Sequence, residues 1–459
     1  MLRNYYFFRF LIILLSFYLT NSVYSQDNLI KDSINPYCQA NDIDEFFQDK
    51  KIKNIEIIID KRKKWIKNAL GILVDFNSEE SKIKDQVNQI TKIGINWFNF
   101  RIDEKYKKKF KSTLVVNFKG KLSCKFRAKI RVTGDIWEHI DWKNGSPLTS
   151  VHVELLDGHI NSITRFKLFI PKARYGKNEI FVSSLLSELG FLAPRTFMVP
   201  ATINGASYEY MFQEDLRKEF LENLKLVEGP ILEGDERFTI RFKDDEMMPS
   251  LSLSRIINRN YSLRGDTNGK IALSAVSNLN LIYLQHHQSK IRNYDRALMK
   301  LFINTDKFFI NKLNRERFQT FDSLMYALDA LHGLSSDDRR FYFDPINKHY
   351  VPIYYDGKAN IFNQNTELID KLPFTFFDAK QGSLKAIKLI NDINHDNFRK
   401  KLINSGLNIS SKEYGNLIKK IIYNLELIKE AEILEVEFLR TNKYFSNLEE
   451  EIVNDKKLI

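Results

Sequence analysis

The chain has 459 residues, of which 43% are hydrophobic and 28% charged, a balance that excludes a largely disordered chain and a polytopic membrane protein. Its two cysteines exclude a disulfide scaffold and any four-cysteine metal site. The formal net charge of +12 predicts either anionic partners or an ordinary solvated basic surface, and the lysine-rich runs at residues 61–64 and 107–109 fit the second interpretation.

The first 25 residues have the pattern of a secretory signal peptide. Arg3 and Arg9 accompany an apolar run at residues 10–19, and Val23 and Ser25 stand at the −3 and −1 positions of a cleavage site. The alternatives are an uncleaved anchor and a short buried helix. We expect an exported protein, in the periplasm, at the cell surface or outside the cell. No transmembrane span remains after cleavage, because no later apolar run is long enough.

Export changes the expected partners of the positive charge. An exported protein does not normally meet chromosomal nucleic acid, so we expect no nucleic-acid partner. Cys38 and Cys124 have the opportunity to pair in an oxidising compartment, but their spacing does not decide whether they do. The oligomeric state is equally open.

Residues 26–110 are expected to form a helical N-terminal extension, since apolar residues recur at three- and four-residue spacing over 42–53 and 83–93. Residues 111–212 then change to alternating patterns. Strands are expected at 112–118, 122–132, 151–156 and 165–170, followed by a helix at 178–189 that Gly190 ends. Asn204-Gly205 suits a type I′ turn between strands at 197–203 and 208–213.

Residues 213–459 have a mainly helical pattern. Helices are expected over 215–226, 273–288, within 296–331, and from 383 onward, most strongly at 421–445. A short β segment interrupts them at 341–343 and 351–355. The order of elements predicts an α+β, protein-kinase-like two-lobed fold. It would have a helical leader, an antiparallel-sheet N-terminal lobe and a mainly helical C-terminal lobe.

The common catalytic motifs are absent: the chain has no G-x-S-x-G, H-E-x-x-H, Walker A or G-x-G-x-x-G sequence. A phosphotransferase of the predicted fold instead needs a phosphate-covering loop, a strand lysine and a helix glutamate. Arg131 begins a candidate loop, Lys167 lies in a predicted strand, and Glu179 or Glu188 lies on the following helix. Each has a plain structural alternative, namely a solvated strand lysine or an acid that favours a helix N-terminus.

The same enzyme also needs a catalytic loop and a metal-binding acid. His332 begins a segment that includes Asp337 and Asp338, either of which is a candidate base or second metal ligand. Asp356 follows a predicted strand and precedes Gly357, so its carboxylate suits a hard cation such as Mg²⁺. The alternatives are a helix C-cap at His332-Gly333 and a turn at Asp356-Gly357.

Three segments together resemble the spore coat protein H (CotH) family of atypical exported kinases. They are Ile130 to Gly134, the hairpin that ends at Glu214, and the sequence Pro-Ile-Tyr-Tyr-Asp-Gly at residues 352–357. The resemblance implies ATP and Mg²⁺ as cofactors and a secreted or envelope protein as substrate. It assigns Asp356 as the metal-binding acid and Glu214 as the acid that ends the hinge strand.

Two departures from the family pattern leave a second hypothesis open. Leu148 follows Pro147 where the family often has lysine, so Lys167 is a substitute, and Asp337-Asp338 replaces an Asp with a separate Asn. We therefore expect a kinase that phosphorylates an exported protein. The alternative is a non-catalytic, pseudokinase-like envelope scaffold that binds an anionic polymer or a protein. Carbohydrate modification by paired carboxylates has no supporting spacing.

Overall fold

The computed structural model describes residues 51–87, 102–119, 123–134, 137–143, 146–235, 240–243, 246–249, 253–288, 301, 303, 305, 311–363 and 377–431. The chain divides into two compact units. The barrel unit contains the residues up to Ala173 together with Phe197–Glu214, and the helical unit contains Arg174–Thr196 and the chain from Asp215 onward. The predicted signal peptide lies outside the described residues.

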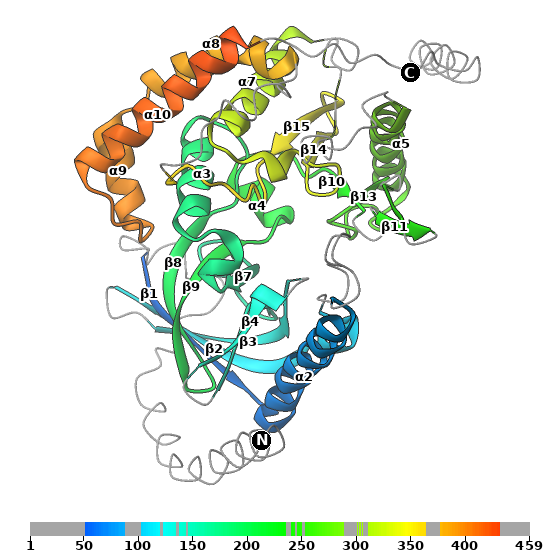
Figure 1. The fold of residues 1–459 in the computed structure, drawn as a ribbon, viewed down its shortest axis with the longest axis vertical. Coiled ribbons are helices and arrows are strands. Elements are labelled where there is room, and N and C mark those ends of the chain that lie inside the picture. Colours follow the sequence, from blue (N-terminus) through cyan, green and yellow to red (C-terminus); the bar gives the residue numbers. More distant parts are fainter. Residues whose placement is uncertain are drawn as a thin grey trace. The chain divides into compact units, whose positions relative to one another are not determined.

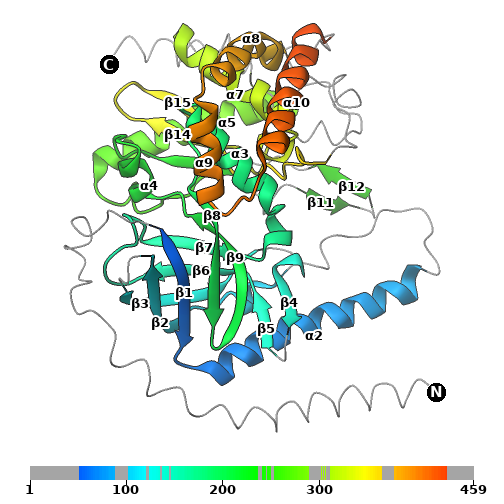
Figure 2. The ribbon, with the colours of Figure 1, turned by 90° about the vertical axis from the view of Figure 1, so that its left-hand side faces the viewer.

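The barrel unit is built on a closed barrel of seven strands in the order β1-β2-β3-β6-β7-β9-β8 (Figures 1 and 2). The strands are β1 (Ile52–Ile59), β2 (Phe110–Phe118), β3 (Ser123–Val132), β6 (Val151–Leu155), β7 (Arg165–Phe169), β8 (Thr196–Ile203) and β9 (Ala206–Glu214). β1 pairs with β2 in antiparallel and with β8 in parallel orientation, so the barrel is mixed.

The interior of the barrel follows from alternation along its strands. In β3, Cys124, Phe126, Ala128 and Ile130 are buried, while the residues between them are exposed or partly buried. Cys124 is disulfide-bonded, and Cys38, the chain's only other cysteine, lies outside the described residues.

The Asn204-Gly205 hairpin is confirmed. Asn204 has φ 49° and Gly205 has φ 90°, the positive values that a type I′ turn requires. The Asn204 side chain also accepts a hydrogen bond from the backbone N–H of Ile59, at 2.8 Å. The turn is therefore fixed to β1 as well as to its own strands.

The predicted protein-kinase-like fold with an antiparallel-sheet N-terminal lobe is wrong. Residues 52–59 were expected to belong to a helical extension, but they form β1 and close the sheet into a mixed barrel. Ile52, Ile55, Ile57 and Ile59 are buried, because β-branched side chains at this spacing pack well on a pleated surface.

The rest of the barrel unit lies around these strands. It comprises α2 (Arg62–Val87), the short 3-10 helices η3 (Glu104–Tyr106) and η4 (Trp137–His139), the hairpin β4 (Ile140–Lys143) and β5 (Ser146–Thr149), and most of η5 (Pro171–Arg174). The predicted helix at 83–93 is present as far as Val87, the last described residue of α2.

The helical unit contains a four-stranded sheet in the order β13-β10-β14-β15. Its strands are β10 (Ile231–Gly234), β13 (Ser254–Ile256), β14 (Arg340–Asp344) and β15 (His349–Ile353), and a separate hairpin joins β11 (Ile240–Lys243) to β12 (Glu246–Pro249). The described helices are α3 (Lys177–Glu188), α4 (Lys218–Asn223), α5 (Asp266–Gln288), α7 (Lys312–Ala327), η8 (Leu331–Leu334), α8 (Phe377–Asn391), α9 (His395–Asn404) and α10 (Ser411–Glu430).

The predicted β segment of the helical unit is confirmed as the β14–β15 hairpin, which joins β10 through antiparallel pairing. The helix expected at 178–189 is confirmed as α3, and Gly190 follows it with φ 82°. Within the described parts of the chain, no helix is both long and apolar enough to cross a membrane. That finding agrees with the absence of a span expected after signal cleavage.

Candidate functional site

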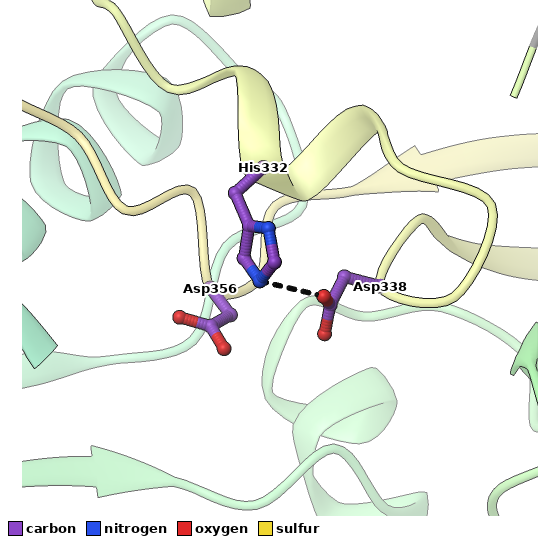
Figure 3. A group of neighbouring side chains, drawn as sticks. All are labelled: His332, Asp338 and Asp356. Carbon is purple, nitrogen blue, oxygen red and sulfur yellow. Dashed lines mark ion pairs between the residues drawn. The ribbon is translucent and has the colours of Figure 1, made fainter. Parts of the chain in front are cut away.

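Three side chains meet in the helical unit, next to the β14–β15 hairpin (Figure 3). His332 belongs to η8, Asp338 precedes β14, and Asp356 follows β15 by three residues. One ligand atom from each lies within 4.8 Å of the others. All three were proposed from the sequence as chemical residues, and the fold brings them together.

The loop that carries His332 is packed tightly against the loop that carries Asp356. The backbone N–H of His332 donates to the carbonyl of Gly357, at 3.2 Å. A Cβ at Gly333 would lie only 2.8 Å from the carbonyl oxygen of Tyr355, so glycine permits the close approach. Asp356 itself has φ 44°, a left-handed conformation that costs free energy for a residue other than glycine.

Asp338 is held by hydrogen bonds on both sides. His332 Nε2 lies 2.8 Å from Asp338 Oδ2, and the backbone N–H of Asp338 donates to Ser335 Oγ at 3.1 Å. Burial alone would raise the pKa of Asp338, but the hydrogen bond and charge of His332, together with the Arg174 charge, hold that pKa below its ordinary value. Asp338 is therefore a carboxylate at neutral pH.

Asp356 is more exposed than Asp338 and forms a direct ion pair with an arginine. Its Oδ2 forms an ion pair with Arg174 Nη1, and Arg174 also donates to the hydroxyl of Tyr355, at 2.9 Å. The side chains of Asp356 and Arg174 are 16% and 10% exposed. A positive charge thus stands directly beside the acids in an environment where solvent screens it little.

A second arginine, Arg340, also contacts the Tyr355 ring. Its guanidinium is 3.3 Å from the centre of the Tyr355 ring and forms an ion pair with Glu233, at 2.6 Å. Burial would lower the pKa of Arg340, but the Glu233 carboxylate raises it, so this residue stays charged. Arg340 and Glu233 fix the position of Tyr355 and, through the chain, of Asp356.

Arg339, next to Asp338, anchors the same segment through a different set of contacts. It pairs with Asp322 of α7 at 2.5 Å and lies 5.4 and 5.8 Å from the ring centres of Phe318 and Phe341, which stack on each other. A buried, paired arginine in contact with aromatic rings is strongly positioned. The backbone that carries Asp338 is therefore held in place on both sides of the acid.

Asp337 and Asp338 have different surroundings, although the sequence left them interchangeable. Asp338 belongs to the group of three, whereas Asp337 does not. Burial and the charge of Asp338 raise the pKa of Asp337. The geometry therefore favours Asp338 over Asp337 as the carboxylate paired with His332.

The remaining predicted residues do not belong to the group of three. Glu179 is buried in α3 of the helical unit and accepts a hydrogen bond from the Tyr354 hydroxyl, at 2.5 Å. Arg131 on β3, Lys167 on β7 and Glu214 on β9 belong to the barrel unit. The expected pairing of Glu179 with Lys167 stays a prediction.

Sequence reasoning missed several residues that shape the site, namely Arg174, Tyr354, Tyr355 and Glu233. The hydrogen bond from Arg174 to Tyr355 spans 181 residues, so no local spacing could have indicated it. The tyrosines gave a weak signal, because they stand directly before Asp356 in the segment that carries the family resemblance.

The donor set fits a divalent cation. Two carboxylates suit hard ions such as Mg²⁺ and Mn²⁺, and an imidazole is a common ligand of transition metals. No protein-family model matches the chain, and no curated protein matches it significantly. Any assignment of function therefore depends on the chemistry of these residues.

Proposed function

We propose that this protein is a metal-dependent phosphotransferase that moves a phosphoryl group from Mg-ATP to a hydroxyl group of an exported or envelope protein. The observation that carries the proposal is the convergence of His332, Asp338 and Asp356 from three separate segments. The proposal rests on this site and not on the fold, since the closed barrel differs from the lobe that a protein kinase would have.

Each residue has a role that its surroundings support. Asp356 and the free oxygen of Asp338 would hold the divalent ion, which when bound neutralises the phosphate oxygens. His332 is 30% exposed and Asp338 only 10%, so the imidazole is the more accessible of the two. Asp338 orients His332, whose neutral imidazole accepts the proton of the attacking hydroxyl.

Arg174 supplies a positive charge directly beside Asp356. It forms an ion pair with Asp356, and exchange of that pair for contacts with phosphate oxygens would free the carboxylate for the ion. Export is part of the same proposal: the N-terminal pattern supports it, and a disulfide-bonded Cys124 suits an oxidising compartment.

The test is transfer of γ-labelled phosphate from ATP to candidate exported proteins, and to the protein itself, with Mg²⁺ or Mn²⁺. The informative variant is Asp356→Asn, because asparagine tolerates φ 44° and keeps the side-chain shape, whereas alanine adds backbone strain. We expect at least about a 100-fold loss of labelling and a matching loss of Mn²⁺ affinity by calorimetry, since Asn lacks the charge that a metal ligand supplies.

The matched control is Asp392→Asn, which removes the same charge at an exposed position after α8. It is expected to label within about twofold of the unchanged protein, because a surface charge far from a site affects chemistry little. Labelling by Asp356→Asn at the control level would refute the site. Absence of Mg-ATP binding in a thermal-shift assay of the unchanged protein would favour the scaffold alternative.

A further inference from the structure

A large basic groove lies in the barrel unit, outside the proposed catalytic site. Its volume is about 980 Å³, and it runs between α2 and the chain from η3 into β2. Lys61, Lys64 and Lys67 line one wall. Lys105, Lys108, Lys109 and Lys111 line the other, and Asp60 is the only carboxylate among the described residues that line the groove.

The two walls are fixed to each other by packing. A Cβ on Gly71 of α2 would lie 2.6 Å from a ring carbon of Tyr106, so the helix approaches η3 as closely as a glycine allows. Asn68 donates to the Tyr106 carbonyl at 2.8 Å, and the Trp65 and Phe110 rings meet edge to face at 5.4 Å. The groove is therefore a built feature of the fold.

Most of the positive charge in the groove is not neutralised by the protein. Lys105 pairs with Asp75 at 2.8 Å and Lys109 with Glu154 at 2.6 Å. The other five lysines, all exposed, form no ion pair with any residue of the described chain; they are Lys61, Lys64, Lys67, Lys108 and Lys111. Like charges gathered in one concave surface raise the local potential and attract anions.

The nature of the lining narrows the class of ligand. The part of the lining that the structure describes contains no arginine, so its lysines act as point charges and do not read the shape of an anionic group. The aromatic rings are already engaged: Trp65 packs on Phe110, and the Lys105 ammonium lies 4.8 Å from the Tyr106 ring centre. The groove thus offers no stacking platform of the kind that single-stranded nucleic acid uses.

An acidic peptide helix is also disfavoured, because such a ligand docks apolar anchor residues among apolar side chains, and the described residues that line the groove include no Leu, Ile, Val or Met. The ligand that remains is a hydrophilic chain with repeated negative charges. Along α2, Lys64 and Lys67 are separated by about 4.5 Å in rise, so a chain lying in the groove meets a positive charge at short intervals.

We propose that this groove binds a linear anionic polysaccharide through sulfate, phosphate or carboxylate groups along the polymer. The site lies in the barrel unit and needs none of the residues of the proposed catalytic centre. Part of the surplus positive charge of the sequence lies in this groove, since two lysine-rich segments about 45 residues apart in the chain both line it.

The test measures binding of fluorescein-labelled heparin and of labelled polygalacturonate to the full protein, by fluorescence polarisation at several salt concentrations. The variant is Lys64→Gln/Lys67→Gln/Lys108→Gln. Glutamine is a good helix former, so α2 is expected to persist, and a thermal unfolding curve checks that it does. We expect at least about a tenfold loss of affinity and a shallower dependence on salt, because three charge contacts disappear. Comparison of the two polymers shows whether sulfate or carboxylate is preferred.

A second basic groove provides the matched control. It has a volume of about 600 Å³ in the helical unit, where Lys312, Lys385 and Lys388 lie among the residues of α7 and α8 that line it. Lys312→Gln/Lys385→Gln/Lys388→Gln removes the same charge and is expected to change heparin binding less than twofold. Equal losses in both triple variants would overturn the proposal, as would no binding to either polymer. Tighter binding to single-stranded DNA or to anionic lipid vesicles would also overturn it.

Discussion

At the scale of single residues, Gly234 links the sheet of the helical unit to the site. A Cβ on this residue of β10 would lie 1.9 Å from the carbonyl oxygen of Ser336 and 2.9 Å from Asp337 Cα. These atoms belong to backbone and cannot rotate away. The segment that carries Asp338 therefore packs directly on β10, and only glycine fits at the contact.

We predict that Gly234→Ala destabilises the helical unit by about 1–3 kcal/mol, the usual cost of an overpacked core position. It is also expected to weaken Mn²⁺ binding at the site, because Asp338 must move with its loop. Chemical denaturation followed by circular dichroism, with calorimetric titration of Mn²⁺, measures both effects.

The control for this substitution is Gly415→Ala on α10. A Cβ there meets nothing within 4 Å, and alanine favours a helix over glycine by up to about 1 kcal/mol. We expect an unchanged or raised stability and unchanged Mn²⁺ binding. A Gly234→Ala protein that behaves like this control would show that the contact between β10 and the Ser336 backbone is not a constraint.

Asp378, at the start of α8, gives a pH dependence of stability. Burial raises its pKa to about 6, and its carboxyl accepts hydrogen bonds from Thr305 at 2.5 Å and from Gln319 at 3.4 Å. Because the folded protein favours the protonated acid, its contribution to stability is present below about pH 4 and is lost as the pH rises through 6. A shift of about two pKa units corresponds to about 3 kcal/mol.

We predict that Asp378→Asn stabilises the helical unit relative to the unchanged protein above pH 6 and has little effect near pH 4. Asparagine keeps an acceptor oxygen for Thr305 and Gln319 but cannot ionise. Thermal unfolding by circular dichroism from pH 4 to 8 tests this, since the two proteins should diverge across that range. Parallel curves would mean that Asp378 does not titrate in this window.

At the scale of elements, short sequence patterns predicted the turns and helix ends whose conformation depends on neighbouring residues alone. Asn204-Gly205 specified its turn because few other residues adopt the required positive φ, and Gly190 marked the end of α3. The β14–β15 hairpin was equally visible. β1 was not, because its isoleucines also match a helical spacing and its partners β2 and β8 lie far along the chain.

The residues of the candidate site also divide into those that local sequence indicates and those that only the folded chain brings together. His332, Asp338 and Asp356 were found because each stands beside a strand or turn with a recognisable pattern. Arg174 and Glu233 were not found, because they reach the site through contacts that only the folded chain creates. The lysine groove was interpreted as solvated surface for a similar reason, as its two walls are separate runs in the sequence.

At the scale of the whole molecule, closure of the barrel depends on β1. Ile57 is 1% exposed and pairs with Leu114 of β2 and with Ile203 of β8. We predict that Ile57→Ala destabilises the barrel unit by about 2–5 kcal/mol through lost burial and a cavity. Ile58→Ala is the control, since the neighbouring isoleucine is 43% exposed and points to the other face.

Tryptophan fluorescence during urea unfolding measures this loss selectively. Of the chain's four tryptophans, those at positions 65, 137 and 142 lie in the described part of the barrel unit, and no tryptophan follows position 142 in the sequence. The Ile57→Ala transition is expected at clearly lower urea than that of Ile58→Ala. Coincident transitions would mean that β1 adds little to the barrel.

The parallel pairing of β1 with β8 also has a consequence for synthesis on the ribosome. Ile59 contacts the turn after β8 through Asn204, 145 residues later in the chain. At 5–20 residues per second, β1 waits roughly 7 to 30 s for that partner to be made. During this interval an isoleucine-rich strand lacks one neighbour, which makes it a natural binding site for chaperones and places ring closure late in folding.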